Sequence, residues 1–243
     1  MIRSVILGLA GVATTIASVP VWVDNPNVFE LELFNNALQF DFYVFAHSWQ
    51  PSFCYHEPYP AQALLGCKEP QEYWKTHFTV HGLWPELNEG PHPGFCSKEE
   101  LNIDLVRKAI GEVTLEEYWP NVKVPVNSSS YDSFWNHEWT RHGTCSGLDQ
   151  VTYFKSAIEL IKTHGTPECI QKSVGKTMST KELREAYGGP KRVVLQCKGK
   201  TLSQVFTCIA KDKNNVPTKA SDCSIQVLKE DTCHGTEVYL PAF

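Results

Sequence analysis

The chain has no apolar run long enough to cross a membrane. Its one sustained apolar stretch spans residues 5–16, whereas a bilayer-spanning helix needs about 18 to 20 apolar residues. Arg3 precedes this stretch, and Thr15-Ile16-Ala17-Ser18 offers small residues for cleavage, as in a secretory signal peptide. We therefore interpret residues 1–18 as a signal peptide. We expect a protein without a membrane anchor that is secreted or delivered to a lysosome or vacuole.

Positive charge is not in excess either. The chain carries 22 Lys and Arg against 27 Asp and Glu, a formal net charge of −5 with nine histidines counted as neutral. A protein that binds duplex DNA through many phosphates normally presents a basic face, so an architectural nucleic-acid binder is disfavoured. A catalyst needs only local positive charge. The sequence also has no internal repeat or long linker, and residues 19–243 are predicted to form one globular domain.

The nine cysteines include no Cys-x-x-Cys pair. A metal site built from them is therefore disfavoured. Their number instead indicates an oxidising compartment and disulfide bonds. Spacing alone does not choose among the possible pairings.

Two short segments hold most of the chemically informative residues. The first is His81-Gly82-Leu83-Trp84-Pro85-Glu86, and the second is residues 134–145, FWNHEWTRHGTC. If the second is helical, residues four apart share a face, which pairs His137 with Arg141 and Glu138 with His142. The two segments together then supply imidazoles, a carboxyl group and a guanidinium.

These groups suit the cleavage of RNA. The ribose 2′-hydroxyl is the nucleophile, so an enzyme needs a base to take its proton, an acid to protonate the departing 5′-oxygen, and cations to hold the phosphate. Histidine serves both proton transfers because its ordinary pKa of about 6.5 lies near working pH. Cationic groups in a water-poor cleft stabilise the pentacoordinate phosphate. No metal or other cofactor is required.

A zinc site is the rival interpretation of the second segment. His137 and His142 are five residues apart, about 140° around a helix, whereas the zinc motif needs histidines four apart. Arg141 occupies the place of the second ligand, and a cation does not bind zinc. A histidine outside the two segments is by default a satisfied core or surface group, and this applies to His47, His56, His77, His92, His164 and His234.

The two segments resemble the active-site segments of the ribonuclease T2 family, the secreted and vacuolar acid endoribonucleases. The resemblance extends to residues 40–45, FDFYVF, residues 49–54, WQPSFC, and residues 119–121, WPN. It implies an α+β domain with a central antiparallel sheet and packed helices. It also implies cleavage of single-stranded RNA, and not of DNA, to a 2′,3′-cyclic phosphate, followed by slower hydrolysis.

The resemblance assigns roles to five side chains. His142 would be the general base, His81 the general acid and His137 a phosphate-binding partner. Glu138 and the cation at position 141 would stabilise the transition state. The family usually has lysine where this chain has Arg141, and arginine keeps the charge but has a larger, planar, differently aimed head group.

The resemblance also suggests substrate contacts. Asn121 and Phe134 match positions that hold a base by amide hydrogen bonds and by stacking. Trp84 would stand beside the substrate, although a core-packing indole is an equal alternative. Ser48 replaces the glutamine of some relatives, so the base preference is left open.

The remaining expectations concern covalent modification and assembly. Asn127-Ser128-Ser129 is a glycosylation sequon, and a monomer is expected. A secreted RNA-binding, cytotoxic or signalling protein of the same fold with little catalysis is the alternative function. The disulfides that the resemblance implies are Cys54–Cys67, Cys96–Cys145, Cys197–Cys233 and Cys208–Cys223, which leaves Cys169 unpaired.

Alternation and helical periodicity predict the elements that carry the site. The first active segment is expected to follow a strand, with His81 near the strand end, and the second to lie on a helix. The expected strands cover residues 40–47, 78–81, 193–197, 204–210 and 224–228, and the expected helices lie near 99–111, 131–143, 150–163 and 180–187.

Overall fold

The computed structural model describes residues 39–56 and 65–243. The expected signal peptide, residues 1–18, lies outside the described residues. No helix in the described part of the chain is both long and apolar enough to cross a membrane.

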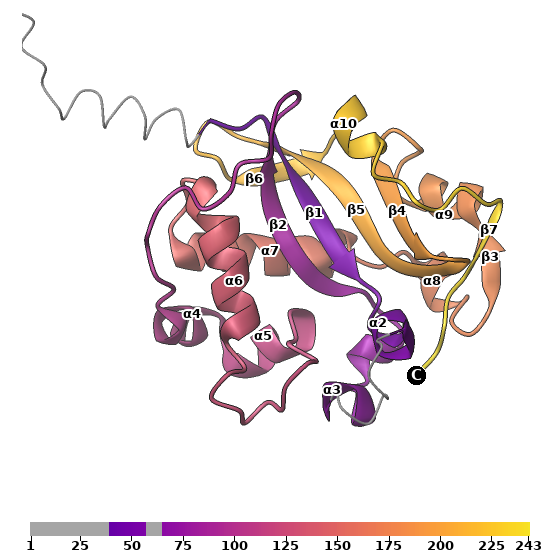
Figure 1. The fold of residues 1–243 in the computed structure, drawn as a ribbon, viewed down its shortest axis with the longest axis horizontal. Helices are drawn as coiled ribbons and strands as arrows, with labels where there is room; N and C mark the ends of the chain where they lie inside the picture. The colour runs from indigo at the N-terminus through magenta and orange to yellow at the C-terminus, as the bar shows by residue number, and fades with distance from the viewer. Residues whose placement is uncertain (1–38, 57–64) are drawn as a thin grey trace, which may run out of the picture.

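A seven-stranded sheet forms the centre of the molecule (Figure 1). Its path runs β2-β1-β5-β7-β3, and β4 and β6 also pair with β5. All pairings are antiparallel except the short contact between β5 and β7. The strands are β1 (Phe42–Ser48), β2 (Thr79–Glu86), β3 (Thr177–Ser179), β4 (Val193–Lys198), β5 (Thr201–Lys211), β6 (Pro217–Ala220) and β7 (Glu237–Tyr239).

Helices flank the sheet on the β2 side, where α4, α5 and α6 lie, and beside β3 and β7, where α8 and α9 lie (Figure 1). This arrangement confirms the predicted α+β domain with a central antiparallel sheet. The helices are α2 (Gln50–His56), α3 (Leu65–Lys68), α4 (Ile103–Ile110), α5 (Glu112–Tyr118), α6 (Ser133–Arg141), α7 (Gln150–His164), α8 (Glu168–Gln171), α9 (Thr180–Ala186) and α10 (Ile225–Leu228), with 3₁₀ turns η1 (Tyr73–Lys75) and η2 (Gly143–Cys145).

Both faces of the sheet are buried. On β1, Tyr43 and Phe45 point into the larger core cluster, whereas Phe42 and Val44 point into a smaller one. The alternation of side chains along a strand thus fills two apolar layers. The sheet is therefore a rigid platform for the residues that β2 and β5 present at its surface.

The structure corrects three local predictions. Residues 224–228 are not a strand: Ser224 caps helix α10 by accepting a hydrogen bond from the Val227 amide at 3.3 Å. The helix expected over 99–111 begins at Ile103, and Gly111, with φ of 96°, separates α4 from α5. His81 is the third residue of β2 and not near its end, because the strand continues through Glu86.

All four expected disulfides form, namely Cys54–Cys67, Cys96–Cys145, Cys197–Cys233 and Cys208–Cys223. Cys169 is a free, half-buried thiol, as expected. The Cys96–Cys145 bond joins the loop after β2 to the turn after α6, so it ties the chain that follows the first predicted active-site segment to the end of the second.

Candidate active site

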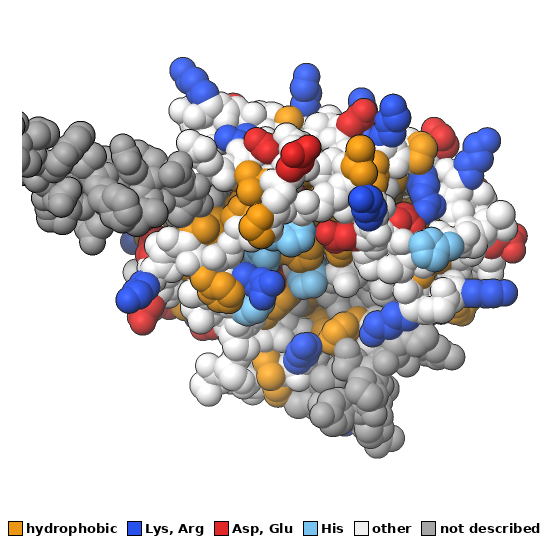
Figure 2. All heavy atoms as spheres, turned by 45° about the horizontal axis from the view of Figure 1, so that its top comes forward, with side chains coloured by type: hydrophobic (Ala, Val, Ile, Leu, Met, Phe, Trp, Pro, Cys, Tyr) orange, Lys and Arg blue, Asp and Glu red, His pale blue; other side chains and the backbone are white. Residues whose placement is uncertain are grey.

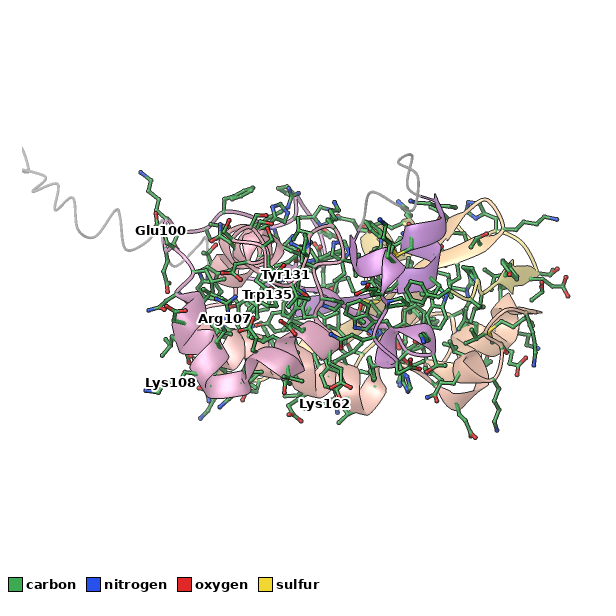
Figure 3. All side chains as sticks on the ribbon, turned by 90° about the horizontal axis from the view of Figure 1, so that it is seen from below. Glu100, Arg107, Lys108, Tyr131, Trp135 and Lys162 are labelled. Carbon is green, nitrogen blue, oxygen red and sulfur yellow. A yellow bond between two sulfur atoms is a disulfide. The ribbon has the colours of Figure 1, made fainter. Side chains whose placement is uncertain are left out.

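Helix α6 is held in place by its core face and by an ion pair at its start. Trp135 and Trp139 are buried in the main core, whereas His137 and Arg141 are exposed. Arg107 of α4 pairs with Asp132, which precedes the helix, and its guanidinium lies 5.7 Å from the Trp135 ring. Figure 3 labels Arg107 and Trp135 on these neighbouring helices. The orientation of the two predicted rows, His137 with Arg141 and Glu138 with His142, is thus fixed.

His81 is fixed between two elements of the sheet. Its Nδ1 lies 2.6 Å from Oε1 of Gln204 on β5, an acceptor, so Nδ1 carries the proton of the neutral ring. Its backbone carbonyl accepts a hydrogen bond from the Trp119 indole at 3.0 Å. Nε2 therefore remains available and lies 3.9 Å from Oε1 of Glu138.

Trp84 bridges the two segments. Its indole Nε1 donates to Oε2 of Glu138 at 2.9 Å, and its ring stacks on the His142 imidazole with centroids 5.2 Å apart. Gly82 leaves the space for this contact, because a Cβ there would lie 2.1 Å from Trp84 Nε1 and 2.2 Å from Glu138 Oε2. Glycine is thus needed at position 82 because a side chain would displace Trp84 and Glu138, and not because the backbone of the strand requires it.

Burial keeps the carboxyl group of Glu138 protonated at pH values well above those at which a carboxyl group ordinarily ionises. Its side chain is almost completely buried. Desolvation raises its pKa to about 8, against smaller lowering effects of the Trp84 hydrogen bond and the Arg141 charge. At acidic pH the group therefore carries a proton that it can donate in a hydrogen bond.

The pKa values of the three imidazoles are lowered, whereas that of Glu138 is raised. Desolvation, followed by the charges of Arg141 and His137, lowers the pKa of His142 to about 3. Desolvation also lowers the pKa of His81, partly opposed by its bond to Gln204, and desolvation and the Arg141 charge lower that of His137. His142 is the most strongly shifted of the three, and its buried Nδ1 has no hydrogen-bond partner among the described residues. It is thus a neutral base over most of the pH range.

Two hollows meet at this cluster. The larger, about 600 Å³, and the smaller, about 500 Å³, share His81, His137 and Glu138 as lining residues. His142 lines only the smaller one. Figure 2 shows histidine side chains gathered around a basic side chain near the centre of this face. The geometry therefore offers a proton-transfer and anion-binding centre with a separate hollow on each side.

The remaining predicted contact residues fall in these hollows. Trp84 lines the smaller one, and Ser48, Asn121 and Phe134 line the larger one. The Phe134 ring lies 5.8 Å from that of His81. Contact with a base stays a prediction for each of these side chains.

Asn121 is buried, and its side chain is already engaged. Its amide nitrogen donates to the Tyr131 carbonyl at 2.9 Å and to the Ser133 hydroxyl at 3.3 Å, and its oxygen accepts from the Lys123 amide. These bonds order the loop before α6. Recognition of a base by the Asn121 side chain would have to replace or share them.

Two neighbours of the site were not predicted from the sequence. Gln204 lies 123 residues from His81. Nothing in its local sequence distinguishes it from the other polar residues of an alternating strand. Phe95 lines the smaller hollow beside Arg141; its place directly before Cys96 was the only available signal. Within residues 39–56 and 65–243, no group of three or more His, Cys, Asp or Glu side chains is arranged to hold a metal ion. That none is needed remains a prediction.

A model of the Ribonuclease T2 family matches residues 40–223. The chain belongs to the ribonuclease T2 family. Ribonuclease DdI of Dictyostelium discoideum is 32% identical over 190 residues, which cover 73% of this chain and 76% of that protein. Intracellular ribonuclease LX of Solanum lycopersicum is 36% identical over 120 residues, 49% of this chain and 47% of that protein.

Solved structures agree with this T2 assignment. The crystal structure of RNase NT in complex with 5′-AMP covers 84% of this chain and 100% of its own, with a TM-score of 0.63 and 26% identity. The predicted family, fold and enzyme class, a T2-type ribonuclease, are thereby confirmed. The segments matched in the tomato relatives span about half of each relative, whereas the slime-mould match spans three quarters.

Proposed function

We propose that the protein is an endoribonuclease that cleaves single-stranded RNA without a metal ion. The products are a 2′,3′-cyclic phosphate, which is hydrolysed more slowly to a 3′-phosphate, and a free 5′-hydroxyl. The observation that carries the proposal is the meeting of two hollows at His81, His137 and Glu138, with His142 on one side. A scissile phosphate at this junction would leave one hollow for each neighbouring nucleoside.

His142 and His81 divide the proton transfers. The neutral His142 takes the proton of the 2′-hydroxyl, the 2′-oxygen bonds to phosphorus, and the bond from phosphorus to the 5′-oxygen breaks. Protonated His81 gives a proton to that departing oxygen. Because the Nδ1 of His81 is held by Gln204, its Nε2 is the donor to the substrate. Hydrolysis of the cyclic phosphate then reverses the two roles.

Glu138, Arg141 and His137 stabilise the charge that develops on the phosphorane. Buried and neutral at acidic pH, Glu138 donates its proton in a hydrogen bond to a phosphoryl oxygen. The exposed Arg141 and His137 lie on the same face of α6 and supply positive charge. Such preorganised donors stabilise a transition state without reorganising during the reaction.

The position of His142 supports one direction for the bound RNA. Because it lines only the smaller hollow, the nucleoside that supplies the 2′-hydroxyl lies there. The departing nucleoside then lies in the larger hollow, beside Phe134 and Lys123. The base preference of each hollow is left open.

The test is incubation of the purified protein with a short single-stranded RNA in excess EDTA. We expect cleavage, a cyclic phosphate resonance by ³¹P NMR, and no cleavage of the matching DNA, which lacks the 2′-hydroxyl. Activity abolished by EDTA and restored by zinc or magnesium would contradict the metal-free mechanism. RNA binding without cleavage would favour the alternative of a non-catalytic protein of the same fold.

The compartment and the modification belong to the same proposal. The expected signal peptide and four disulfides favour an oxidising destination outside the cytosol. Curated relatives include an extracellular ribonuclease LE as well as an intracellular ribonuclease LX. Asn127 is exposed, which supports glycosylation of a secreted monomer. Glycosylation at Asn127 is tested by treating the secreted protein with a glycosidase, which should lower its mass.

A further inference from the structure

Phe95 has an unusual backbone and an unusual exposure. Its φ is 55°, in the left-handed region that non-glycine residues rarely adopt. Its large apolar side chain is nevertheless 62% exposed, so burial of the ring does not explain why a phenylalanine occupies this position. Non-glycine residues held in the left-handed backbone region cluster at functional sites.

Two links to the end of α6 hold Phe95 in this conformation. Its amide donates to the Arg141 carbonyl at 2.9 Å. The next residue, Cys96, is joined to Cys145, and its amide donates to the Thr144 hydroxyl at 3.2 Å. The loop after β2 is thereby fastened to the segment that carries Arg141 and His142.

The result of this fastening is a contact between side chains. The guanidinium carbon of Arg141 lies 5.7 Å from the centroid of the Phe95 ring, within the range of a cation–π interaction. Arg141 forms no ion pair among the described residues. Both side chains line the smaller hollow, together with His142. The Phe95 ring is thus an aromatic partner of this exposed cation.

We propose that Phe95 is a positioning residue whose ring holds the Arg141 guanidinium toward the phosphate. The role rests on the proposed function, in which Arg141 stabilises the phosphorane. A flexible arginine without a carboxylate partner samples many rotamers, and an aromatic face restricts them without neutralising the charge. A planar guanidinium also stacks on such a face better than an ammonium does.

The test combines turnover with a double-mutant cycle. We expect Phe95→Leu to lower kcat on a short RNA by about three- to tenfold, the range of a cation–π contact, with KM little changed, and Phe95→Tyr to keep wild-type turnover. In an Arg141→Met background, Phe95→Leu should have no further effect. Tyr239→Leu, at another partly exposed aromatic residue on β7, is the matched control and should leave turnover unchanged.

Two further measurements separate positioning from folding and from catalysis. Phe95→Asn suits the left-handed backbone, so its Tm should equal or exceed that of the parent while kcat still falls. By NMR, the Arg141 side-chain protons should be shifted by the ring current in the parent and lose that shift in Phe95→Leu. An equal loss of kcat with and without Arg141, or unchanged Arg141 resonances, would overturn the proposal. A parent that cleaves no RNA would instead refute the proposed function, and the NMR comparison would still decide the contact.

Discussion

His81 and His142 have separable roles that substitution can test. His81→Ala and His142→Ala should each lower kcat/KM by about 10²- to 10⁴-fold, the usual contribution of a positioned proton donor or acceptor. His164→Ala, at an exposed histidine of α7, is the control and should cleave like the parent. Cleavage rates on one defined oligoribonucleotide provide the measurement, and near-parental activity in either of the first two variants would remove that residue from the acid and base pair.

The shifted pKa values predict an acidic optimum. The base works when His142 is deprotonated, which is satisfied above its lowered pKa of about 3. The acid works when His81 is protonated, and burial lowers the pKa of His81 below the ordinary 6.5. Activity therefore rises through the first pKa and falls through the second as pH increases. A profile of kcat/KM against pH that peaks above 7 would contradict this assignment.

Substitution of Arg141 distinguishes stabilisation of the transition state from the role of a solvated surface residue. If it stabilises the phosphorane, Arg141→Ala should lower turnover by about 2 to 4 kcal/mol of transition-state stabilisation, and Arg141→Lys should keep most of the activity because the charge remains. A solvated helix residue would contribute under about 1 kcal/mol to stability and nothing to turnover. Turnover of the folded Arg141→Ala protein equal to that of the parent would mean that the cation has no catalytic role.

The Cys96–Cys145 bond fastens the loop that follows the first active-site segment to the end of the second. Its removal by a double Cys→Ser change should cost about 4 kcal/mol of stability in the chain-entropy model and should also lower the activity of the protein that stays folded. Cys197–Cys233 closes a loop of similar length, 36 against 49 residues of separation, but lies outside the site. Its removal should destabilise comparably and spare kcat. Denaturant titration and kcat at a temperature where both variants are folded distinguish the two bonds.

The elements that the sequence predicted best are those with a long, regular pattern. Helix α6 follows from the spacing of Trp135, Trp139 and the polar residues between them, so its site-bearing rows could be anticipated. The apolar run at 225–228 is too short for its period to distinguish a strand from a helix, and the cap by Ser224 decided the outcome. The contacts of His81 with Gln204 and of Arg141 with Phe95 depend on tertiary packing, which no local pattern encodes.

A buried histidine that takes no part in the proposed mechanism makes the fold sensitive to acid. His47 is fully buried, with Nδ1 3.2 Å from the Gly165 carbonyl and Nε2 3.2 Å from the Thr207 hydroxyl. Burial lowers its pKa to about 3 in the folded chain, while the unfolded value is about 6.5. The unfolded state thus binds the proton first, so the stability present above pH 6.5 is lost as pH falls toward 3.

Between pH 7 and 4.5 this histidine alone should reduce the free energy of unfolding by about 2 to 3 kcal/mol. His47→Gln keeps a donor and an acceptor without titrating, and should flatten the dependence. His234→Gln, at an exposed histidine that is not among the groups shifting the pKa of His47, is the control and should leave the slope unchanged. Urea unfolding at several pH values measures all three proteins, and parallel curves for the parent and His47→Gln would contradict the prediction.

The pairing of β1 with β5 governs when the enzyme can first act during its own synthesis. Residues 42–48 find their sheet partners at 204–210, and the Nδ1 of His81 donates its hydrogen bond to Oε1 of Gln204. A ribosome must therefore translate almost the whole message before the central strand is available and the acid is oriented. We therefore expect a nascent chain that lacks β5 to be inactive on RNA, so that cleavage begins only when synthesis is nearly complete.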